Sequence, residues 1–208
     1  MEEYFDNAPS FRIYTKADTG YSLAIRDGEV ILSEDDPTDP LQHWYKDQRY
    51  SGDVTDEAGY PSFALVNKEA ELALKHPNNP SEAVQLSSFD PNDLDASLLW
   101  TEGDDAGGGF RAVRMVSNIN LNLDAWGADK EDGGGISEGT GVAVYEWCEG
   151  ENLNQLWRIE AYCTESASAK DIGAAGSESY TATLGAELVS VTGDFVATPV
   201  PLSSVSID

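Results

Sequence analysis

The side chains of residues 124–155 include types that can bind sugars. They are the carboxylate of Asp124, the rings of Tyr145 and Trp147, and the amides of Asn154 and Gln155. A carboxylate and an amide supply directional hydrogen bonds to two adjacent hydroxyl groups. An aromatic ring offers a flat apolar face to the C–H side of a pyranose. Asp124 taken alone is also typical of an ordinary turn. We therefore predict a sugar site here only on the condition that these side chains lie close together in the fold.

No other pattern in the chain indicates a reactive or metal-binding site. The two cysteines, Cys148 and Cys163, do not form a CxxC pair, and His43 and His76 are far from each other, so zinc-site spacing is absent. The acidic, glycine-rich stretch 129–135 lacks the alternating acids of an EF-hand loop. No Ser/His/Asp or Cys/His arrangement and no phosphate-binding loop is visible. We therefore expect no catalytic residues, no metal and no cofactor.

The charge of the chain restricts its partners. Against 38 Asp and Glu there are only 12 Lys and Arg, and the formal net charge is −26. Such a field repels phosphate backbones and anionic membranes, so we expect neither nucleic-acid binding nor membrane insertion. The first ten residues, MEEYFDNAPS, lack the basic and apolar regions of a signal peptide. We expect an intracellular chain with reduced cysteines.

Three tryptophans mark an internal repeat. Trp44, Trp100 and Trp157 are separated by 56 and 57 residues. Each closes a similar four-residue phrase: LQHW, SLLW and NQLW. We predict that the three indoles are core residues, and that Gln42 and Gln155 bond to the backbone of their own repeats.

Short alternating segments precede each of these tryptophans and are typical of β-strands. They span 11–16, 21–25 and 30–32 in the first repeat, 63–68, 72–74 and 84–86 in the second, and 110–116, 121–123 and 142–145 in the third. Turn-forming residues separate them at 27–28, 77–80 and 133–135. Each repeat is too small to bury its apolar face alone, so we predict an all-β fold with three pseudo-repeats.

The chain ends differ in composition from this repeat region. We predict a flexible leader over 1–10, the repeat domain over 11–159, and a C-terminal extension over 160–208 that begins with an Ala-, Ser- and Gly-rich linker. The extension has three weak strand patterns at 180–184, 187–191 and 194–197. These strands cannot hold a core of their own, so the extension either docks on the main domain or stays largely disordered.

The repeated Gln-x-Trp phrase resembles that of the ricin-B-type β-trefoil. The phrases at 42–47, 63–68, 98–102, 114–116 and 121–125 are similar to the plant Euonymus-type lectin domain, and the resemblance covers residues 11–159. It implies a β-trefoil of about twelve short strands, arranged as three lobes around a pseudo-threefold axis.

The resemblance also implies how a sugar site is built. In the ricin-B pattern an acid follows the second strand, and an aromatic residue lies seven positions before an Asn that precedes the Gln. Asp124, Trp147, Asn154 and Gln155 fit this pattern in lobe three. Strand alignment with the lectin family makes Tyr145 the aromatic platform instead, and implies two extra residues in the loop 148–153. Both rings therefore remain candidates.

The other two lobes depart from the pattern. Lobe one has an acid, Asp27, but position 41 is Leu where Asn is expected. Glu34 occupies the position of the aromatic platform. Lobe two has Lys75 and His76 after its second strand and Ser97 in the Asn position. We predict one working site, in lobe three.

The resemblance implies a non-enzymatic lectin that binds mannose- or galactose-containing glycans or glycoproteins, is located in the cytoplasm and nucleus, and is linked to stress responses. The alternative is a trefoil whose sugar site has decayed and which acts as an acidic protein-interaction module. A hydrolase would need a pair of carboxylates in a cleft, which trefoil lobes rarely offer.

Overall fold

The computed structural model describes residues 8–93, 95–127, 134–147, 152–162, 180–184 and 187–191. The chain divides into two compact units, residues 1–163 and 164–208. Most of the predicted leader (1–7) and of the predicted linker (163–179) lies outside the described residues.

The first unit repeats one pattern three times: four strands, with a 3-10 helix before the fourth. Lobe one contains β1 (Phe11–Thr15), β2 (Tyr21–Arg26), β3 (Glu29–Glu34), η1 (Pro40–Gln42) and β4 (Trp44–Asp47). Lobe two contains β5 (Ser62–Asn67), β6 (Leu72–Lys75), β7 (Gln85–Ser88), η2 (Ala96–Leu98) and β8 (Leu99–Glu102). Lobe three contains β9 (Arg111–Met115), β10 (Asn118–Ala125), β11 (Thr140–Glu146), η3 (Leu153–Gln155) and β12 (Leu156–Ala161).

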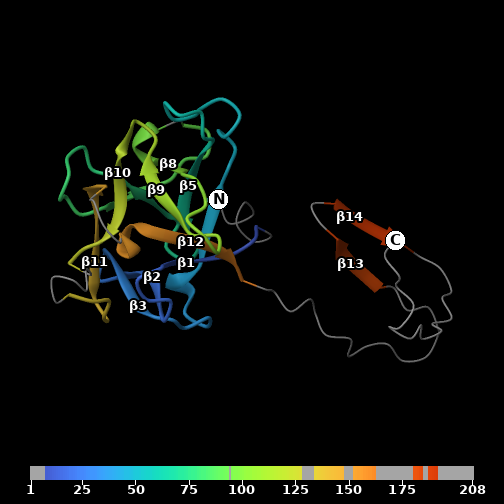
Figure 1. Cartoon of the computed structure of the whole chain (residues 1–208), viewed down its shortest axis with the longest axis horizontal. Coiled ribbons are helices and arrows are strands. Elements are labelled where there is room, and N and C mark those ends of the chain that lie inside the picture. Colours follow the sequence, from blue (N-terminus) through green and yellow to red (C-terminus); the bar gives the residue numbers. More distant parts are fainter. Residues whose placement is uncertain are drawn as a thin grey trace, which may run out of the picture. The chain divides into compact units, whose positions relative to one another are not determined.

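The first and fourth strands of the lobes close into a barrel. Around it, β1 pairs with β4, β4 with β5, β5 with β8, β8 with β9, β9 with β12, and β12 with β1. The second and third strands form the hairpins β2–β3, β6–β7 and β10–β11, which are joined by pairing of β11 with β3 and by a bridge between Ala83 and Ala143 (Figure 1). This arrangement confirms the predicted all-β trefoil with three pseudo-repeats.

One hydrogen bond recurs in the core of every lobe. The indole Nε1 of Trp44 donates to the Leu23 carbonyl (2.8 Å), that of Trp100 to Leu74 (3.0 Å), and that of Trp157 to Leu123 (2.8 Å). All three indoles are completely buried, which confirms that they are core residues. A buried indole N–H must find an acceptor, so each bond ties the fourth strand of a lobe to its second strand.

These bonds allow the lobes to be compared position by position. Leu23, Leu74 and Leu123 are equivalent, and they pair across their hairpins with Leu32, Leu86 and Val144. The next position along the second strand is Ala24 in lobe one, Lys75 in lobe two and Asp124 in lobe three. The next position along the third strand is Ser33, Ser87 and Tyr145.

The two ends of the first unit meet beside His43. Ser10 Oγ lies 2.8 Å from His43 Nδ1, and Tyr162 stacks on the His43 ring at 4.3 Å between centroids. The Tyr162 amide donates to the Ser10 carbonyl (2.8 Å), and burial raises the pKa of the Tyr162 hydroxyl to about 12. The contacts of this unit therefore continue past both predicted boundaries, residues 11 and 159.

The second unit contains a two-stranded antiparallel sheet, β13 (Tyr180–Leu184) with β14 (Glu187–Val191). Both strands were expected at these residues, whereas the third, at 194–197, lies outside the described residues. In the described part of the chain, none of the helices has the length and apolar character needed to cross a membrane.

Replacing Trp100 by Ala should lower the free energy of unfolding by roughly 3–5 kcal/mol, because it opens a cavity and leaves the Leu74 carbonyl without its donor. The matched control is Trp147→Ala, since Trp147 is 50% exposed. Chemical denaturation should show a small effect for the control. Equal losses for the two variants would mean that Trp147 is also buried structure.

A protein truncated after Thr164 should melt cooperatively, because every strand of the barrel and of its three hairpins ends by Ala161. Calorimetry of the truncated and full-length proteins tests this prediction. Aggregation of the truncated protein, or a large fall in its melting temperature, would show that residues 165–208 are an integral part of the fold.

Candidate functional site

Three of the predicted site residues meet at the end of β10. Asp124 is 7% exposed, and its carboxylate Oδ2 accepts hydrogen bonds from Gln155 Nε2 (2.8 Å) and Asn154 Nδ2 (3.1 Å). Asn154 and Gln155 belong to η3, which the chain forms just before β12. The hydrogen bond from Trp157 to Leu123 brings this segment beside β10. The same bond therefore positions both the core and the cluster.

The amides are themselves held by the backbone. Gln155 Nε2 also donates to the Glu146 carbonyl (3.1 Å), as Gln42 Nε2 does to Glu34 in lobe one (2.8 Å). The predicted backbone bonds of both glutamines are therefore confirmed. Asn154 Nδ2 also donates to the Ala125 carbonyl (3.4 Å). The additional bond to a carboxylate distinguishes Gln155 from Gln42.

The two aromatic candidates lie along the neighbouring strand. Asp124 pairs with Ala143 and Asn122 pairs with Tyr145, so Asp124 and Tyr145 are diagonal neighbours on one face of the β10–β11 hairpin. Trp147 follows one residue after β11 ends. Tyr145 is 43% exposed and Trp147 is 50% exposed, so both rings are open to solvent. Strand register places Tyr145 nearer to the carboxylate.

A third exposed ring was not predicted from the sequence. Trp126, two residues after Asp124, is 54% exposed. Among the described residues, Trp126, Tyr145 and Trp147 are the large hydrophobic side chains that remain exposed, and all three belong to the hairpin of lobe three. The signal was available as Asp124-Ala125-Trp126, because alternation in a strand places the first and third side chains on the same face. The ricin-B pattern does not include that position.

The loop after β11 is longer than its counterpart in lobe one. Gln155 comes nine positions after its Glu146 acceptor, whereas Gln42 comes eight positions after Glu34. Relative to lobe one, the insertion is therefore one residue. The loop itself, 148–151, lies outside the described residues.

Lobe one has no acid at the position of Asp124, contrary to the expectation from sequence. Asp27 lies in the β2–β3 turn with φ 51°, and the equivalent of Asp124 is the buried Ala24. The prediction that Glu34 occupies the position of the aromatic platform is also wrong. Ser33 corresponds to Tyr145, and Glu34 corresponds to Glu146, because the backbone bonds of the two glutamines align them.

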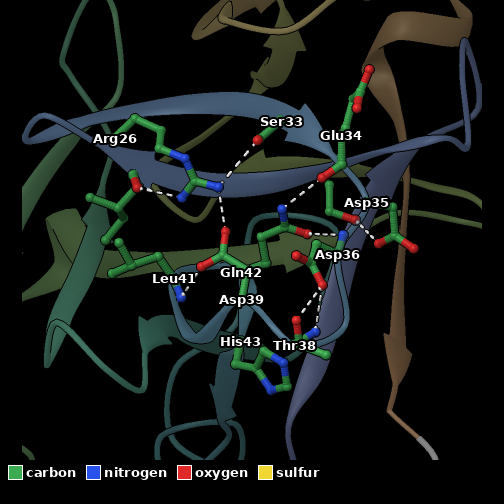
Figure 2. Close-up of polar contacts among 12 residues, drawn as sticks. Arg26, Ser33, Glu34, Asp35, Asp36, Thr38, Asp39, Leu41, Gln42 and His43 are labelled. Carbon is green, nitrogen blue, oxygen red and sulfur yellow. Dashed lines mark hydrogen bonds and ion pairs between the residues drawn. The ribbon is translucent and has the colours of Figure 1, made fainter.

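Polar contacts within the protein occupy the corresponding region of lobe one (Figure 2). Arg26, at the position of Trp126, donates to Ser33 Oγ (3.2 Å) and forms an ion pair with Asp39. Gln42 Oε1 accepts from the Asp36 amide (3.0 Å), and hydrogen bonds from Thr38 lower the pKa of Asp36. These side chains are thus bonded to other groups of lobe one, with an arginine in place of an exposed indole.

Lobe two carries a cation where lobe three has its carboxylate. Lys75 takes the position of Asp124, and its Nζ lies 3.8 Å from Asp95 Oδ2. Hydrogen bonds from Ser97, together with the Lys75 charge, lower the pKa of Asp95. Leu98 stands where lobe three has Gln155. Within the described chain, lobe three alone combines a carboxylate with two amides in this register.

The described residues contain no group of three or more His, Cys, Asp or Glu side chains placed to hold a metal ion. Most of the acidic, glycine-rich stretch 129–135 falls outside that part of the chain.

No family model matches the chain. The chain is 47% identical over 166 residues to the ricin B-like lectin R40C1 of Oryza sativa subsp. japonica, covering 77% of this chain and 47% of that protein. It is 46% identical over 154 residues to the ricin B-like lectin R40G3 of the same plant, covering 74% of each. Identity to the ricin B-like lectin EULS3 of Arabidopsis thaliana is 47% over 148 residues, covering 71% and 46%. The chain therefore spans about half the length of R40C1 and EULS3.

Solved structures share the fold at low identity. The ricin B-like lectin of Macrolepiota procera, in complex with lactose, has a TM-score of 0.51 and 20% identity, covering 73% of this chain and 94% of that one. The β-trefoil BEL has a TM-score of 0.50 and 16% identity, covering 76% and 99%. At these identities the comparison shows the β-trefoil fold alone.

The bond between Gln155 and Asp124 can be tested by a double-mutant cycle. Asp124→Ala and Gln155→Leu should each be destabilising, but their combined effect should fall short of the sum by about 1 kcal/mol or more, because the residues share one hydrogen bond. Leucine is chosen because lobe two has Leu98 at this position. Urea denaturation of the four proteins provides the measurement.

Gln42→Leu is the control partner for this cycle, since Gln42 has the same backbone bond but lies in another lobe. Its effect should add to that of Asp124→Ala within about 0.5 kcal/mol. Additivity in both cycles would contradict the bond between Asp124 and Gln155.

Proposed function

Because the chain belongs to the ricin B-like lectin family and has the Euonymus-type domain, we propose that it binds glycans reversibly through lobe three alone, without catalysing a reaction. The observation that carries this proposal is the buried Asp124 carboxylate, oriented by Asn154 and Gln155 beside two exposed rings. The described residues of lobes one and two do not offer this combination.

The Asp124 carboxylate would accept hydrogen bonds from two adjacent sugar hydroxyls. A carboxylate offers about four acceptor positions and can therefore accept bonds from amides and from hydroxyls. The amide oxygen of Asn154, which is half-buried, is a further acceptor at the same point. Charge-assisted bonds of this kind are stronger than neutral ones and depend on geometry, which would distinguish one sugar epimer from another.

The aromatic rings would supply the apolar contact. Tyr145 lies nearer to Asp124 by strand register, so we assign it the C–H face of the sugar that the carboxylate holds. Trp147 lies farther along the same edge of the hairpin and is available to a ligand of greater length.

The site favours neutral ligands and binds them with low affinity. A shallow site with a few contacts gives a binding free energy of roughly −4 to −7 kcal/mol, or a Kd between about 1 mM and 10 µM. The held carboxylate and amides reduce the ordering cost of binding, since their hydrogen bonds fix their side chains before the ligand arrives. A chain of net charge −26 repels anionic glycans, so neutral mannose- or galactose-containing glycans are the proposed class.

A glycan array probed with the purified full-length protein tests this function. We expect selective signals from neutral glycans that the free sugar abolishes by competition. A blank array would contradict the lectin function and favour the alternative, an acidic protein-interaction module with a decayed site.

Asp124→Asn should weaken glycan binding by roughly 10- to 100-fold. It removes the charge, and its amide hydrogens would face the donors of Asn154 and Gln155. Asp27→Asn is the matched control: it makes the same change of charge on an exposed turn of lobe one, and Asn tolerates the positive φ at that position. Titration calorimetry compares the two variants with the unsubstituted protein.

A greater loss for Asp27→Asn than for Asp124→Asn would place the site in lobe one and overturn the assignment to lobe three. The melting temperatures of both variants confirm that each remains folded.

A further inference from the structure

The exposure of Trp126 has no explanation in the cluster around Asp124. Large aromatic side chains normally bury about 150–250 Å² of surface, yet this indole is 54% exposed. Its backbone is held, because the Trp126 amide donates to the Gly141 carbonyl (2.9 Å) and so continues the pairing of β10 with β11. Trp126, Tyr145 and Trp147 are all exposed on this one hairpin, and such a gathering of exposed apolar side chains is typical of a surface that contacts a ligand.

Trp126 lines a pocket where the three hairpins converge. The pocket is bounded by residues 28–31 of lobe one, residues 83–86 of lobe two, and Gly139, Gly141 and Val142 of lobe three. Its volume is about 540 Å³. Ligand sites in proteins commonly occupy about 300–1,000 Å³, so this pocket has room for a small ligand or for part of a larger one.

The pocket has an apolar floor and a polar rim. Val30, Val84 and Val142 are equivalent positions two residues before the hairpin-paired Leu32, Leu86 and Val144, and all three are buried. At the rim, the exposed side chains of Glu29 and Gln85 provide a carboxylate and an amide.

Glycines keep the pocket open. A Cβ atom placed on Gly28, Gly139 or Gly141 would meet no atom within 4 Å. Gly141 lies opposite Trp126 across the hairpin, so β11 has no side chain at the position paired with the indole.

Trp126 and the Asp124 cluster lie along one face of the same hairpin, so Trp126 connects the cluster with the pocket that it lines. Trp126, Asp124 and Asn122 alternate along β10 and its extension, and Tyr145 pairs with Asn122. Tyr145 lies opposite Asn122, which is four residues from Trp126 along the strand. At about 3.3 Å per residue, the positions of Trp126 and Tyr145 along the hairpin are about 13 Å apart. That separation exceeds the length of one sugar ring, so a single sugar held by Asp124 and Tyr145 would not also cover Trp126.

We propose that Trp126 and this pocket form a second subsite of the glycan site, and that the ligand is a neutral oligosaccharide extending from Asp124 towards the pseudo-threefold axis. The inference rests on the proposed lectin function and adds the length and direction of the ligand. The subsite offers the same chemistry as the first: an aromatic face, a carboxylate and an amide. Glu29 at the rim and the net charge of −26 disfavour an anionic occupant.

Titration calorimetry of the full-length protein tests the proposal with two series of probes: mannose, mannobiose and mannotriose, and galactose, lactose and a galactose-terminated trisaccharide. In the series that binds, affinity should rise at least about fivefold from the monosaccharide to the trisaccharide. Trp126→Ala should abolish this rise and leave the Kd of the monosaccharide within about twofold.

A second variant fills the subsite without changing the indole. Gly141→Val places a side chain in the open space beside Trp126, and valine suits a strand. It should also abolish the rise with chain length. Gly52→Val is its matched control, because a Cβ at Gly52 likewise meets no atom within 4 Å, and this residue lies in a turn between β4 and β5, outside the residues that line the pocket. The control should keep the full rise.

Fluorescence gives an independent reading. Of the five tryptophans, only Trp126 and Trp147 are exposed. In Trp147→Phe, saturating trisaccharide should therefore protect Trp126 from acrylamide quenching, and saturating monosaccharide should not.

Equal affinity for monosaccharide and trisaccharide, equal weakening of both by Trp126→Ala, or unchanged quenching with trisaccharide would overturn the second subsite and leave the lectin function intact. Failure of the unsubstituted protein to bind either series would overturn the lectin function itself, and this inference with it.

Discussion

The structure depends on one hydrogen bond made three times, from a buried indole N–H on the fourth strand of each lobe to a carbonyl on the second strand. An indole can be buried only if its N–H finds an acceptor, and the barrel excludes water from all three. Each bond therefore sets the register between a hairpin and the barrel. In lobe three the same register brings Asn154 and Gln155 against Asp124.

The three lobes share this backbone and differ in what they place on it. The position after the bonded leucine is Ala24, Lys75 or Asp124, and the equivalent of Tyr145 is a serine in the other two lobes. In lobe one, Arg26 occupies the position of the exposed Trp126, and it forms an ion pair with Asp39 and a hydrogen bond with Ser33. A symmetric scaffold thus supports an asymmetric surface, because the core bonds use indole groups and main-chain carbonyls, and leave the outward side chains free to vary.

The charge and the exposed rings act together on the choice of ligand. An acidic surface lowers the local concentration of anions, and it has little effect on neutral molecules. Hydrogen bonds and aromatic contacts are then the main source of affinity. Both are short-ranged, so a shallow site gains strength chiefly by contacting more of the ligand.

The sequence by itself determined the three repeats, the all-β class and the identity of the buried tryptophans, because strand alternation and turn residues are local signals and the Gln-x-Trp phrase recurs at even spacing. The trefoil followed from the resemblance of these phrases to the lectin family. The sequence also identified Asp124, Tyr145, Trp147, Asn154 and Gln155 as candidates. It misassigned Asp27 and Glu34 in lobe one and missed Trp126, because the equivalence of the lobes depends on which carbonyl each indole reaches and on pairing between strands. Those are contacts between distant residues, so only the tertiary structure decided them.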